Sequence, residues 1–432
     1  MSPGRLSWTR SRKCAQGVSA LLVDQLFAAR PTLVRAFASL WPAHESRPGD
    51  EVQTILSIAI IITLATSLAI VLRFGTLRCE GTMPVSLFTF MAILFTSGLD
   101  VGLIMFPLTE FPTYASEEPY AFANPLAIEF GFWGFLVWGF YFLTSFYFVV
   151  VEPKLQLFEI PVVKIVNNIV IIGTCAFTAY LFLTYLPNYI EGISEPARFG
   201  LVALVVLLSV LSSTDIRYVK VLSIASTWMF FALILGMWAT SGMGVTGFAS
   251  SIAGVGEYFT NLHRFVTPIT DYHAFYLFWW FSWSIMIGQF VARFVGGLPA
   301  WQLLIAMLVL PSIPLAVWFA VLYFYHAQNV EVVAFFRLAM VAVGIVFVIN
   351  SLDSLIRLYT TNLDLTVESH GKLLYIAGNF AAMFGLVLLY QFTPLKIEWI
   401  GLVVIGLYAA IYTLLFLHRH ELRGEGLLAS RR

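Results

Sequence analysis

Charged residues are scarce in this sequence. Of its 432 residues only 11% are Asp, Glu, Lys or Arg, whereas 59% are hydrophobic and the mean hydropathy is +0.86. A soluble fold needs more polar side chains than this to cover its surface, so a soluble protein is excluded. Basic and acidic residues balance at 24 each, which removes the basic excess that nucleic-acid binding requires.

Cysteine and histidine are also few. The three cysteines, Cys14, Cys79 and Cys175, are widely spaced and predict neither a disulfide framework nor a zinc site. None of the seven histidines lies in the middle of an apolar stretch, which argues against haem ligation or a histidine-based intramembrane active site. No phosphate-binding glycine loop accompanies a strand–helix unit. We therefore expect no enzyme, no metal, no cofactor and no ATP-driven transport.

Long apolar stretches occupy most of the chain. A bilayer crossing needs about 20 apolar residues, and Gly, Pro and charged breaks divide the sequence into eleven such windows. They run near 53–73, 85–106, 127–151, 161–186, 197–213, 221–241, 271–295, 300–325, 332–352, 371–392 and 397–417. The strands of a membrane β-barrel would be about 10 residues long and alternating. The sequence therefore predicts an all-α polytopic membrane protein, surrounded by membrane lipids.

Three regions follow from this pattern: a basic N-terminal arm (1–50), a transmembrane core (51–418) and a polar C-terminal tail (419–432). The arm is rich in Arg and Ser and poor in acids, which is typical of organelle transit sequences. That interpretation favours the mitochondrial inner membrane over the plasma membrane. The alternative is a cytoplasmic arm that binds anionic lipid head groups.

Some charged residues fall inside the apolar windows or just beyond their ends, and an ionised group within the bilayer costs roughly 3 kcal/mol or more. Asp353 and Arg357 are one helical turn apart, and we expect them to pair at a helix end. Asp100 lies among small residues in Ser97-Gly98-Leu99-Asp100-Val101-Gly102. One interpretation is a Gly98-x-x-x-Gly102 packing motif. The other is a broken helix whose loosened backbone lines a transport site, with Asp100 as a proton or cation site.

Two windows carry an unusual number of aromatic side chains. They are Trp133, Trp138 and Tyr141 in one window, and Trp279, Trp280 and Trp283 in the other. On continuous helices the first set lies at about 0°, 140° and 80° and the second at about 0°, 100° and 40°. If the two faces meet, their rings form a cage that holds a quaternary ammonium cation by cation–π attraction. The alternative is that these rings pack helices together or form an interfacial belt.

These residues carry a family resemblance. The stretch 276–293, Tyr-Leu-Phe-Trp-Trp-Phe-Ser-Trp-Ser-Ile-Met-Ile-Gly-Gln-Phe-Val-Ala-Arg, resembles the signature helix of the betaine/carnitine/choline transporter family. The spacing Trp133…Trp138…Tyr141 resembles that family's second aromatic helix. Weaker similarities are Arg73-Phe74-Gly75, Glu110 at a family Ala-Glu-Pro, and Asn350-Ser351-Leu352-Asp353-Ser354 near a Thr-Ser-Ala-Asp-Ser element. The likeness covers about residues 53–417.

The resemblance implies a LeuT-like bundle of two inverted five-helix repeats, and secondary transport of a trimethylammonium solute such as betaine, choline or carnitine. Trp133, Trp138, Tyr141 and Trp280 would form the ammonium cage, with Trp279 and Trp283 beside it on the permeation path. An expected partner is thus the solute itself. The surface helix expected within 248–262 resembles one used for trimer contacts in the family.

The resemblance also implies where a coupling ion would bind. Sodium-coupled relatives place a cation at positions that are here Thr96, Leu99, Phe347, Asn350 and Ser351. Proton-coupled relatives carry an acid in the glycine stretch. Asp100 therefore indicates coupling to protons, or no coupling, rather than coupling to sodium.

The sequence departs from the family pattern in three places. The first of the family's twelve helices is absent or reduced to the poorly apolar segment 17–41, Ile285 replaces a proline, and Val295-Gly296-Gly297-Leu298 replaces an Arg-Gly-Arg loop. These departures support a second hypothesis. In it, the chain is a transport-inactive structural subunit of a larger inner-membrane complex, for example a mitochondrial respiratory one.

Overall fold

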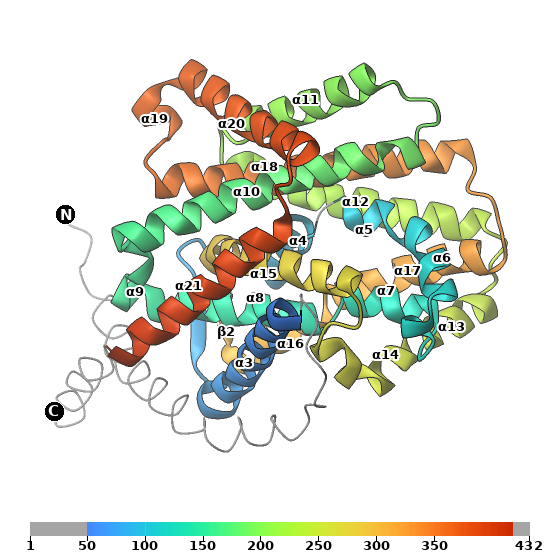
Figure 1. Cartoon of the computed structure of the whole chain (residues 1–432), viewed down its shortest axis with the longest axis horizontal. Coiled ribbons are helices and arrows are strands. Elements are labelled where there is room, and N and C mark those ends of the chain that lie inside the picture. Colours follow the sequence, from blue (N-terminus) through green and yellow to red (C-terminus); the bar gives the residue numbers. More distant parts are fainter. Residues whose placement is uncertain (1–49, 100, 418–432) are drawn as a thin grey trace, which may run out of the picture.

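The computed structural model describes residues 50–99 and 101–417, which are almost entirely helical (Figure 1). Ten helices in these residues are long and apolar enough to cross a membrane, and the shorter apolar helix Leu87–Gly98 belongs to an eleventh, broken span. The prediction of an all-α, multi-pass integral membrane protein is confirmed. The predicted N-terminal arm, the C-terminal tail and Asp100 lie outside the described residues.

Each predicted window corresponds to one span. In chain order the spans are α3 (Asp50–Phe74); α4 (Leu87–Gly98), α5 (Gly102–Met105) and α6 (Pro107–Ser116); α7 (Pro125–Trp133) and α8 (Leu136–Phe146); α10 (Pro161–Tyr185); α11 (Glu195–Ser212); α12 (Arg217–Thr240); α15 (Asp271–Val291); α16 (Ala300–Val309) and α17 (Ser312–Ala327); α18 (Ala334–Asn362); α20 (Lys372–Phe392); and α21 (Ile397–Leu417). The connecting elements are β1 (Arg78–Glu80), η1 (Glu118–Tyr120), the π turn η2 (Tyr147–Val151), α9 (Glu152–Leu155), η3 (Leu157–Glu159), η4 (Leu186–Asn188), α13 (Val245–Ala253), α14 (Gly256–Thr260), η5 (Leu262–Val266), η6 (Ala292–Phe294), β2 (Gly296–Pro299) and α19 (Val367–His370).

Local sequence explains where several spans begin. The side chain of Asn124 accepts a hydrogen bond from the Ala127 N–H, and Pro125 occupies the first turn of α7. Ser194 caps α11 in the same way, and the Thr270 hydroxyl accepts from the His273 N–H at the start of α15. Such caps satisfy backbone N–H groups that have no partner within the helix, and proline fits the first turn because it lacks an N–H.

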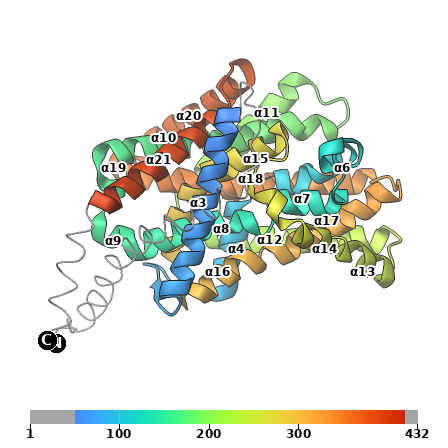
Figure 2. The same ribbon diagram turned by 60° about the horizontal axis from the view of Figure 1, so that its bottom comes forward.

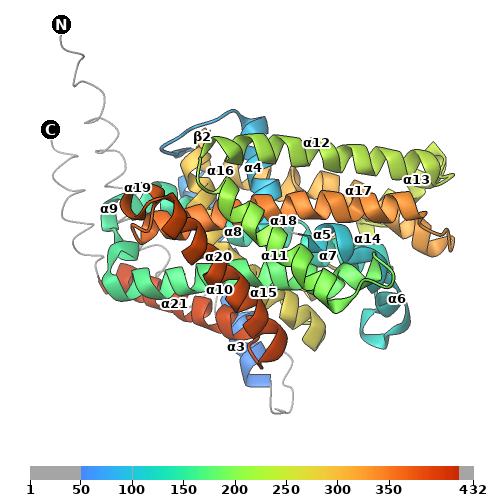
Figure 3. The ribbon, with the colours of Figure 1, turned by 90° about the horizontal axis from the view of Figure 1, so that it is seen from above.

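The packing of the spans repeats internally. The first five spans from α4 to α12 and the next five from α15 to α21 make equivalent contacts. In this correspondence α4 matches α15, α10 matches α18, α11 matches α20 and α12 matches α21. The contact of α12 with α4 is matched by that of α21 with α15, and the contacts of α11 and α12 with α18 are matched by those of α20 and α21 with α10 (Figures 1 and 3). Each unit makes an odd number of crossings, so the second unit starts on the opposite side of the membrane from the first. The predicted inverted-repeat bundle is confirmed.

α15 forms the centre of this bundle. Its most apolar stretch is 89% buried, whereas the corresponding stretches of α11, α20 and α21 are only 28% buried. The latter three expose large apolar side chains, including Leu373, Phe392 and Trp399, as expected for a surface that faces lipid. α3 lies outside the repeats and crosses α8 (Figure 2).

α8 and α15 approach each other closely. A Cβ atom on Gly288 would lie 2.1 Å from Oγ1 of Thr144 and 2.8 Å from its backbone carbonyl carbon. The Thr144 hydroxyl in turn donates to the Ser284 carbonyl at 2.7 Å. Small residues allow transmembrane helices to approach in this way, with polar hydrogen bonds across the contact.

The Asp353–Arg357 pair forms, but its predicted position was wrong. Both residues lie inside α18 rather than at its end, and both are buried. Nη2 of Arg357 is 2.8 Å from Oδ1 of Asp353 and also donates to the carbonyls of Ser212 and Asp215, where α11 ends. α18 runs to Asn362, past the predicted end at 352, because these polar groups are satisfied internally.

The prediction for the connection between α12 and α15 was partly wrong. It contains two short helices, α13 and α14, rather than one surface helix within residues 248–262. α13 packs on α17 and α14 on α7, and Tyr258 is fully buried. This segment therefore closes one end of the bundle.

The loop after α15 pairs with the end of α3. β1 and β2 form an antiparallel two-stranded sheet in which Arg78 faces Pro299 and Cys79 faces Leu298. The Gly81 N–H also donates to the Val295 carbonyl at 2.9 Å. Backbone hydrogen bonds thus hold the loop that differs from the family's Arg-Gly-Arg pattern.

We predict that Gly288→Ala lowers stability by about 1–3 kcal/mol, because the added Cβ forces α8 away from α15. The matched control is Gly385→Ala on α20, where a Cβ would meet nothing within 4 Å. The midpoint of heat-induced aggregation in detergent measures both variants. Equal midpoints would mean that the contact is not tightly packed.

We predict that Arg357→Met is strongly destabilising, by about 3–5 kcal/mol, because it leaves the Asp353 carboxylate buried without its partner. Asp353→Asn combined with Arg357→Met should recover much of this loss. Yield of monodisperse protein and its thermal midpoint measure the effect. A double variant as unstable as the single one would contradict the assignment.

Candidate functional site

The second span is broken as one of the two sequence interpretations predicts. α4 ends at Gly98, Leu99 is extended (φ −125°, ψ 153°), and a helix resumes at Gly102. The freed carbonyls accept from side chains of other spans. Ser351 donates to Leu99 at 3.0 Å, and the Tyr141 hydroxyl donates to Gly98 at 3.2 Å.

A second break, which the sequence analysis missed, interrupts the third span. α7 ends at Trp133, and Phe135 has φ 47° and ψ −85° before α8 begins. The ring angles expected for a continuous helix over 133–141 were therefore wrong. Side chains again satisfy the freed groups. The Trp280 indole donates to the Phe132 carbonyl at 2.7 Å, and the Phe135 N–H donates to the hydroxyl of Ser312 at 2.9 Å.

Five of the six predicted aromatic residues come together. Trp133, Trp138, Tyr141, Trp279 and Trp280, here called the ring cluster, are 0–1% exposed. The ring centroids of Trp133 and Trp280 are 5.2 Å apart, those of Trp138 and Tyr141 5.3 Å, and those of Tyr141 and Trp280 6.5 Å, all edge to face. Trp279 stacks on Trp280. The cluster adjoins the broken second span, because a Cβ on Gly98 would lie 3.5 Å from the Tyr141 ring.

Trp283 is buried but, among the described residues, makes none of these ring contacts. Its indole N–H and those of Trp133, Trp138 and Trp279 have no hydrogen-bond acceptor of good geometry within residues 50–99 and 101–417. A buried donor without a partner costs about 1–3 kcal/mol. The N–H groups of Trp138, Trp279 and Trp283 are therefore available to an oxygen atom of a bound molecule, whereas that of Trp133 lies near Glu129.

The predicted ion-coupling residues also meet, apart from Asp100, which lies outside the described residues. The Asn350 amide donates to Oγ1 of Thr96 at 2.8 Å, and Ser351 donates to the carbonyls of Thr96 and Leu99. Phe347 supplies no oxygen and packs against Phe95. The amide N–H of Asn350 thus donates to Oγ1 of Thr96, which is one of the oxygens that a metal cation at this position would need as a ligand.

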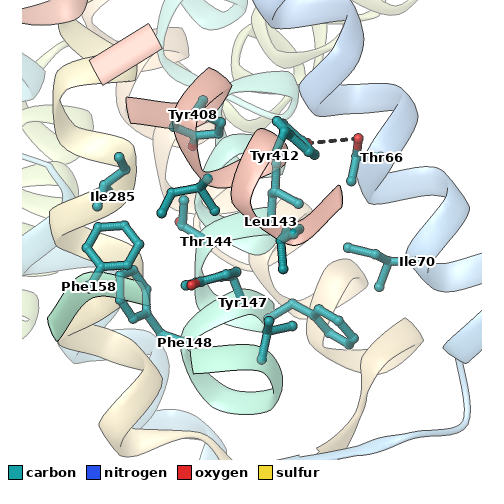
Figure 4. Close-up of a pocket in the computed structure, with 14 residues that line it drawn as sticks. Thr66, Ile70, Leu143, Thr144, Tyr147, Phe148, Phe158, Ile285, Tyr408 and Tyr412 are labelled. Atoms are coloured by element: carbon teal, nitrogen blue, oxygen red, sulfur yellow. Dashed lines mark hydrogen bonds between the residues drawn. The ribbon is translucent and has the colours of Figure 1, made fainter. Parts of the chain in front are cut away.

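A partly open pocket lies apart from the ring cluster, between α3, α8, α15 and α21 (Figure 4). Its walls include Ile70, Leu143, Phe148 and Ile285, and the Tyr412 hydroxyl donates to Thr66 at 2.9 Å. No charged side chain is among its lining residues. It therefore offers a cation neither a counter-charge nor the predicted cage.

Two buried carboxyl groups lie next to the ring cluster. Glu110, which lies at the position of a family Ala-Glu-Pro motif, is on α6 and only 4% exposed. Glu129 is fully buried four residues before Trp133 and was missed. An acid within the apolar window 127–151 was the available signal, because ionisable groups inside membranes are costly and mark functional sites.

The fold and this site define a class of protein: an inverted-repeat membrane bundle with broken helices and buried polar groups at its centre. Comparisons with known proteins point to one family. The sequence model of the betaine/carnitine/choline family transporter matches residues 171–329. Over this stretch, which is less than half of the chain, the sequence is therefore similar to a family of transporters.

Curated relatives agree with this assignment. The glycine betaine transporter OpuD of Bacillus subtilis is 26% identical, covering 54% of each chain. The high-affinity choline transport protein of Escherichia coli is 25% identical, covering 68% of this chain and 50% of the relative. The chain spans about half the length of the curated relatives that it matches. A solved Na⁺-coupled sialic acid symporter is 14% identical with a TM-score of 0.42, covering 88% of this chain and 86% of the symporter.

Proposed function

We propose that the chain binds a quaternary ammonium solute such as choline, betaine or carnitine in the ring cluster and moves it across the membrane by secondary transport. One observation carries this proposal: Trp133, Trp138, Tyr141 and Trp280 converge from two spans beside a broken helix. Ring faces attract an ammonium cation by about 0.5–2 kcal/mol each. Broken helices at a repeat interface are typical of substrate sites in secondary transporters.

The edge-to-face packing supports a closed state of the site. In such pairs the positive edge of one ring lies against the negative face of the next. An ammonium group competes for those same faces, so binding requires the rings to separate. Rocking of one repeat against the other supplies this separation. The unpartnered indole N–H groups then suit a hydroxyl or carboxylate oxygen of the solute.

We predict that Trp138→Ala or Tyr141→Ala weakens choline binding about 5- to 30-fold, the loss of one cation–π contact of about 1–2 kcal/mol. Tyr141→Phe, which keeps the ring, should bind nearly normally. Quenching of tryptophan fluorescence in purified protein measures this, with Trp399→Ala on the exposed face of α21 as the control. A signal unchanged by millimolar betaine, choline and carnitine alike would exclude the proposed site.

We propose that transport is coupled to protons, or to no ion, rather than to sodium. The Asn350–Thr96 hydrogen bond supports this, because the amide occupies one of the two acceptor sites of the Thr96 oxygen and places its positive N–H end where a sodium ion would bind. The role of Asp100 as a proton site stays a prediction. We expect uptake into proteoliposomes to be unchanged when potassium replaces sodium at constant ionic strength. Uptake that requires sodium would contradict this.

The alternative function, a transport-inactive subunit of a larger inner-membrane complex, rests on the loop at β2. In this chain backbone hydrogen bonds hold a loop that lacks the family's two arginines. Comigration with other chains on a native gel from the source membrane would favour this alternative. Recovery as a free monomer or homotrimer would remove it. The mitochondrial location rests on the N-terminal arm alone, and the relatives reported above are bacterial.

A further inference from the structure

Glu110 receives three tyrosine hydroxyl groups. Tyr114 donates to its Oε2 at 2.6 Å, Tyr276 lies 2.8 Å from Oε1 and 2.9 Å from Oε2, and Tyr272 donates to Oε1. Three donors around one carboxyl group favour its ionised form. No Lys or Arg forms an ion pair with Glu110 within the described part of the chain, so this charge has no cationic partner there.

The carboxyl group of Glu129 has a different environment from that of Glu110. Glu129 is fully buried on α7, which packs directly on α6, the helix that carries Glu110, and the two acidic side chains interact there. Neither of its oxygens receives a hydrogen bond of good geometry from any described residue. Two carboxylates in contact in an apolar interior cannot both remain ionised, so one of them holds a proton. The tyrosine hydrogen bonds of good geometry all go to Glu110, whereas Tyr114 and the Trp133 indole lie near Glu129 without forming one. The proton therefore belongs on Glu129.

This carboxyl pair is continuous with the ring cluster. Glu129 precedes Trp133 by four residues on α7, so the two side chains share one helix face. The ring of Tyr276, which donates to Glu110, contacts Trp133 at 5.6 Å and Trp279 at 5.8 Å. A cation among the rings would therefore feel any charge on the pair with little screening, because the surroundings are apolar.

Other titratable groups occupy the elements packed around the pair. They are Tyr120 on η1, Tyr185 and Tyr189 at the end of α10, Asp271 and His273 on α15, Glu257 and Tyr258 on α14, Tyr323 and His326 on α17, and His263 and Arg264 on η5. Of these, His273 is the nearest alternative proton donor along α15. Its ring stacks on Phe132, and its Nδ1 accepts from the Ile269 N–H, so it is held as a neutral, structural side chain.

We propose that Glu110 and Glu129 form a proton-binding site that makes the ring cluster select a solute with net positive charge, such as choline, in exchange for a proton. This inference rests on the proposed function. When the cation binds, the O–H bond of the Glu129 carboxyl group breaks, the proton leaves to water, and the negative charge gained balances the ammonium charge. A zwitterion such as betaine gains less binding free energy from the pair, because its own carboxylate is repelled by the two acidic groups.

The first experiment examines the proton in the absence of solute. Infrared spectra of the purified full-length protein at pH 7 should show the band of a buried protonated carboxyl group, and Glu129→Gln should remove it. Glu118→Gln, an exposed acid on η1, is the control and should leave the band unchanged. Absence of the band from the wild type, or its persistence in Glu129→Gln, would overturn the proton site.

The second experiment examines the exchange. Calorimetry of choline binding in buffers of different ionisation enthalpy should give release of about one proton per choline, with affinity rising up to about tenfold per pH unit. Glu129→Gln should abolish the release and weaken choline about tenfold while affecting betaine less. Proton release that persists in Glu129→Gln would assign it to another group and overturn the exchange.

The two proposals fail in different ways. If neither choline nor betaine binds while the infrared band behaves as expected, the proposed function fails and the exchange fails with it, but the proton site stands. If choline binds without proton release and no more tightly than betaine, the proposed function stands and the charge selection is wrong.

Discussion

The structure depends on one constraint: backbone groups freed inside an apolar bundle must find hydrogen-bond partners there. An unsatisfied backbone group at membrane depth costs several kcal/mol, and lipid offers no replacement for water. Two spans are broken, and each break is completed by side chains of other spans. Tyr141 and Ser351 complete the break after Gly98, and Trp280 completes the break after Trp133. The breaks and the ring cluster are consequently one unit.

This unit also explains why the helices approach so closely. Gly288 allows α15 to lie against Thr144 of α8, which carries Trp138 and Tyr141 to the same level as Trp280. The first spans of the two repeats differ in this arrangement. The first span of the first repeat is broken, whereas α15, its equivalent in the second, is a continuous helix of 21 residues. One wall of the site is thus a continuous helix and the other a broken span.

The spans and most of the site could be predicted from the sequence because both rest on local signals. Apolar windows of membrane-spanning length define the eleven spans, and the glycine stretch around Gly98 indicates the first break. The second break escaped because Phe135 adopts a positive φ that only the surrounding contacts stabilise. Helical angles therefore misplaced Trp133, whereas its resemblance to a family motif did not depend on a continuous helix.

The pairing of Glu110 with Glu129 was not predicted from the sequence, for a different reason. Glu129 was visible as an acid in an apolar window, but Glu110 follows the window 85–106 and has the appearance of a loop residue. Pairing of residues from separate elements is set by tertiary structure alone. The same limit applied to Arg357, whose contacts with Ser212 and Asp215 place the Asp353 pair inside the bundle rather than at a helix end.

The buried acids of the described residues have two kinds of environment. One acid has a cationic partner, which indicates a structural role, and the other two have none, which indicates a functional role. Arg357 forms an ion pair with Asp353 and also donates to α11, which links two helices. The charge of Asp353 is therefore balanced within the fold. Glu110 and Glu129 have tyrosine hydroxyls and each other but no cationic side chain within the described residues. A fold that only needed stability would gain by replacing such a pair with apolar residues. An uncompensated charge beside a cluster of aromatic faces is therefore best explained by a positive partner that comes and goes.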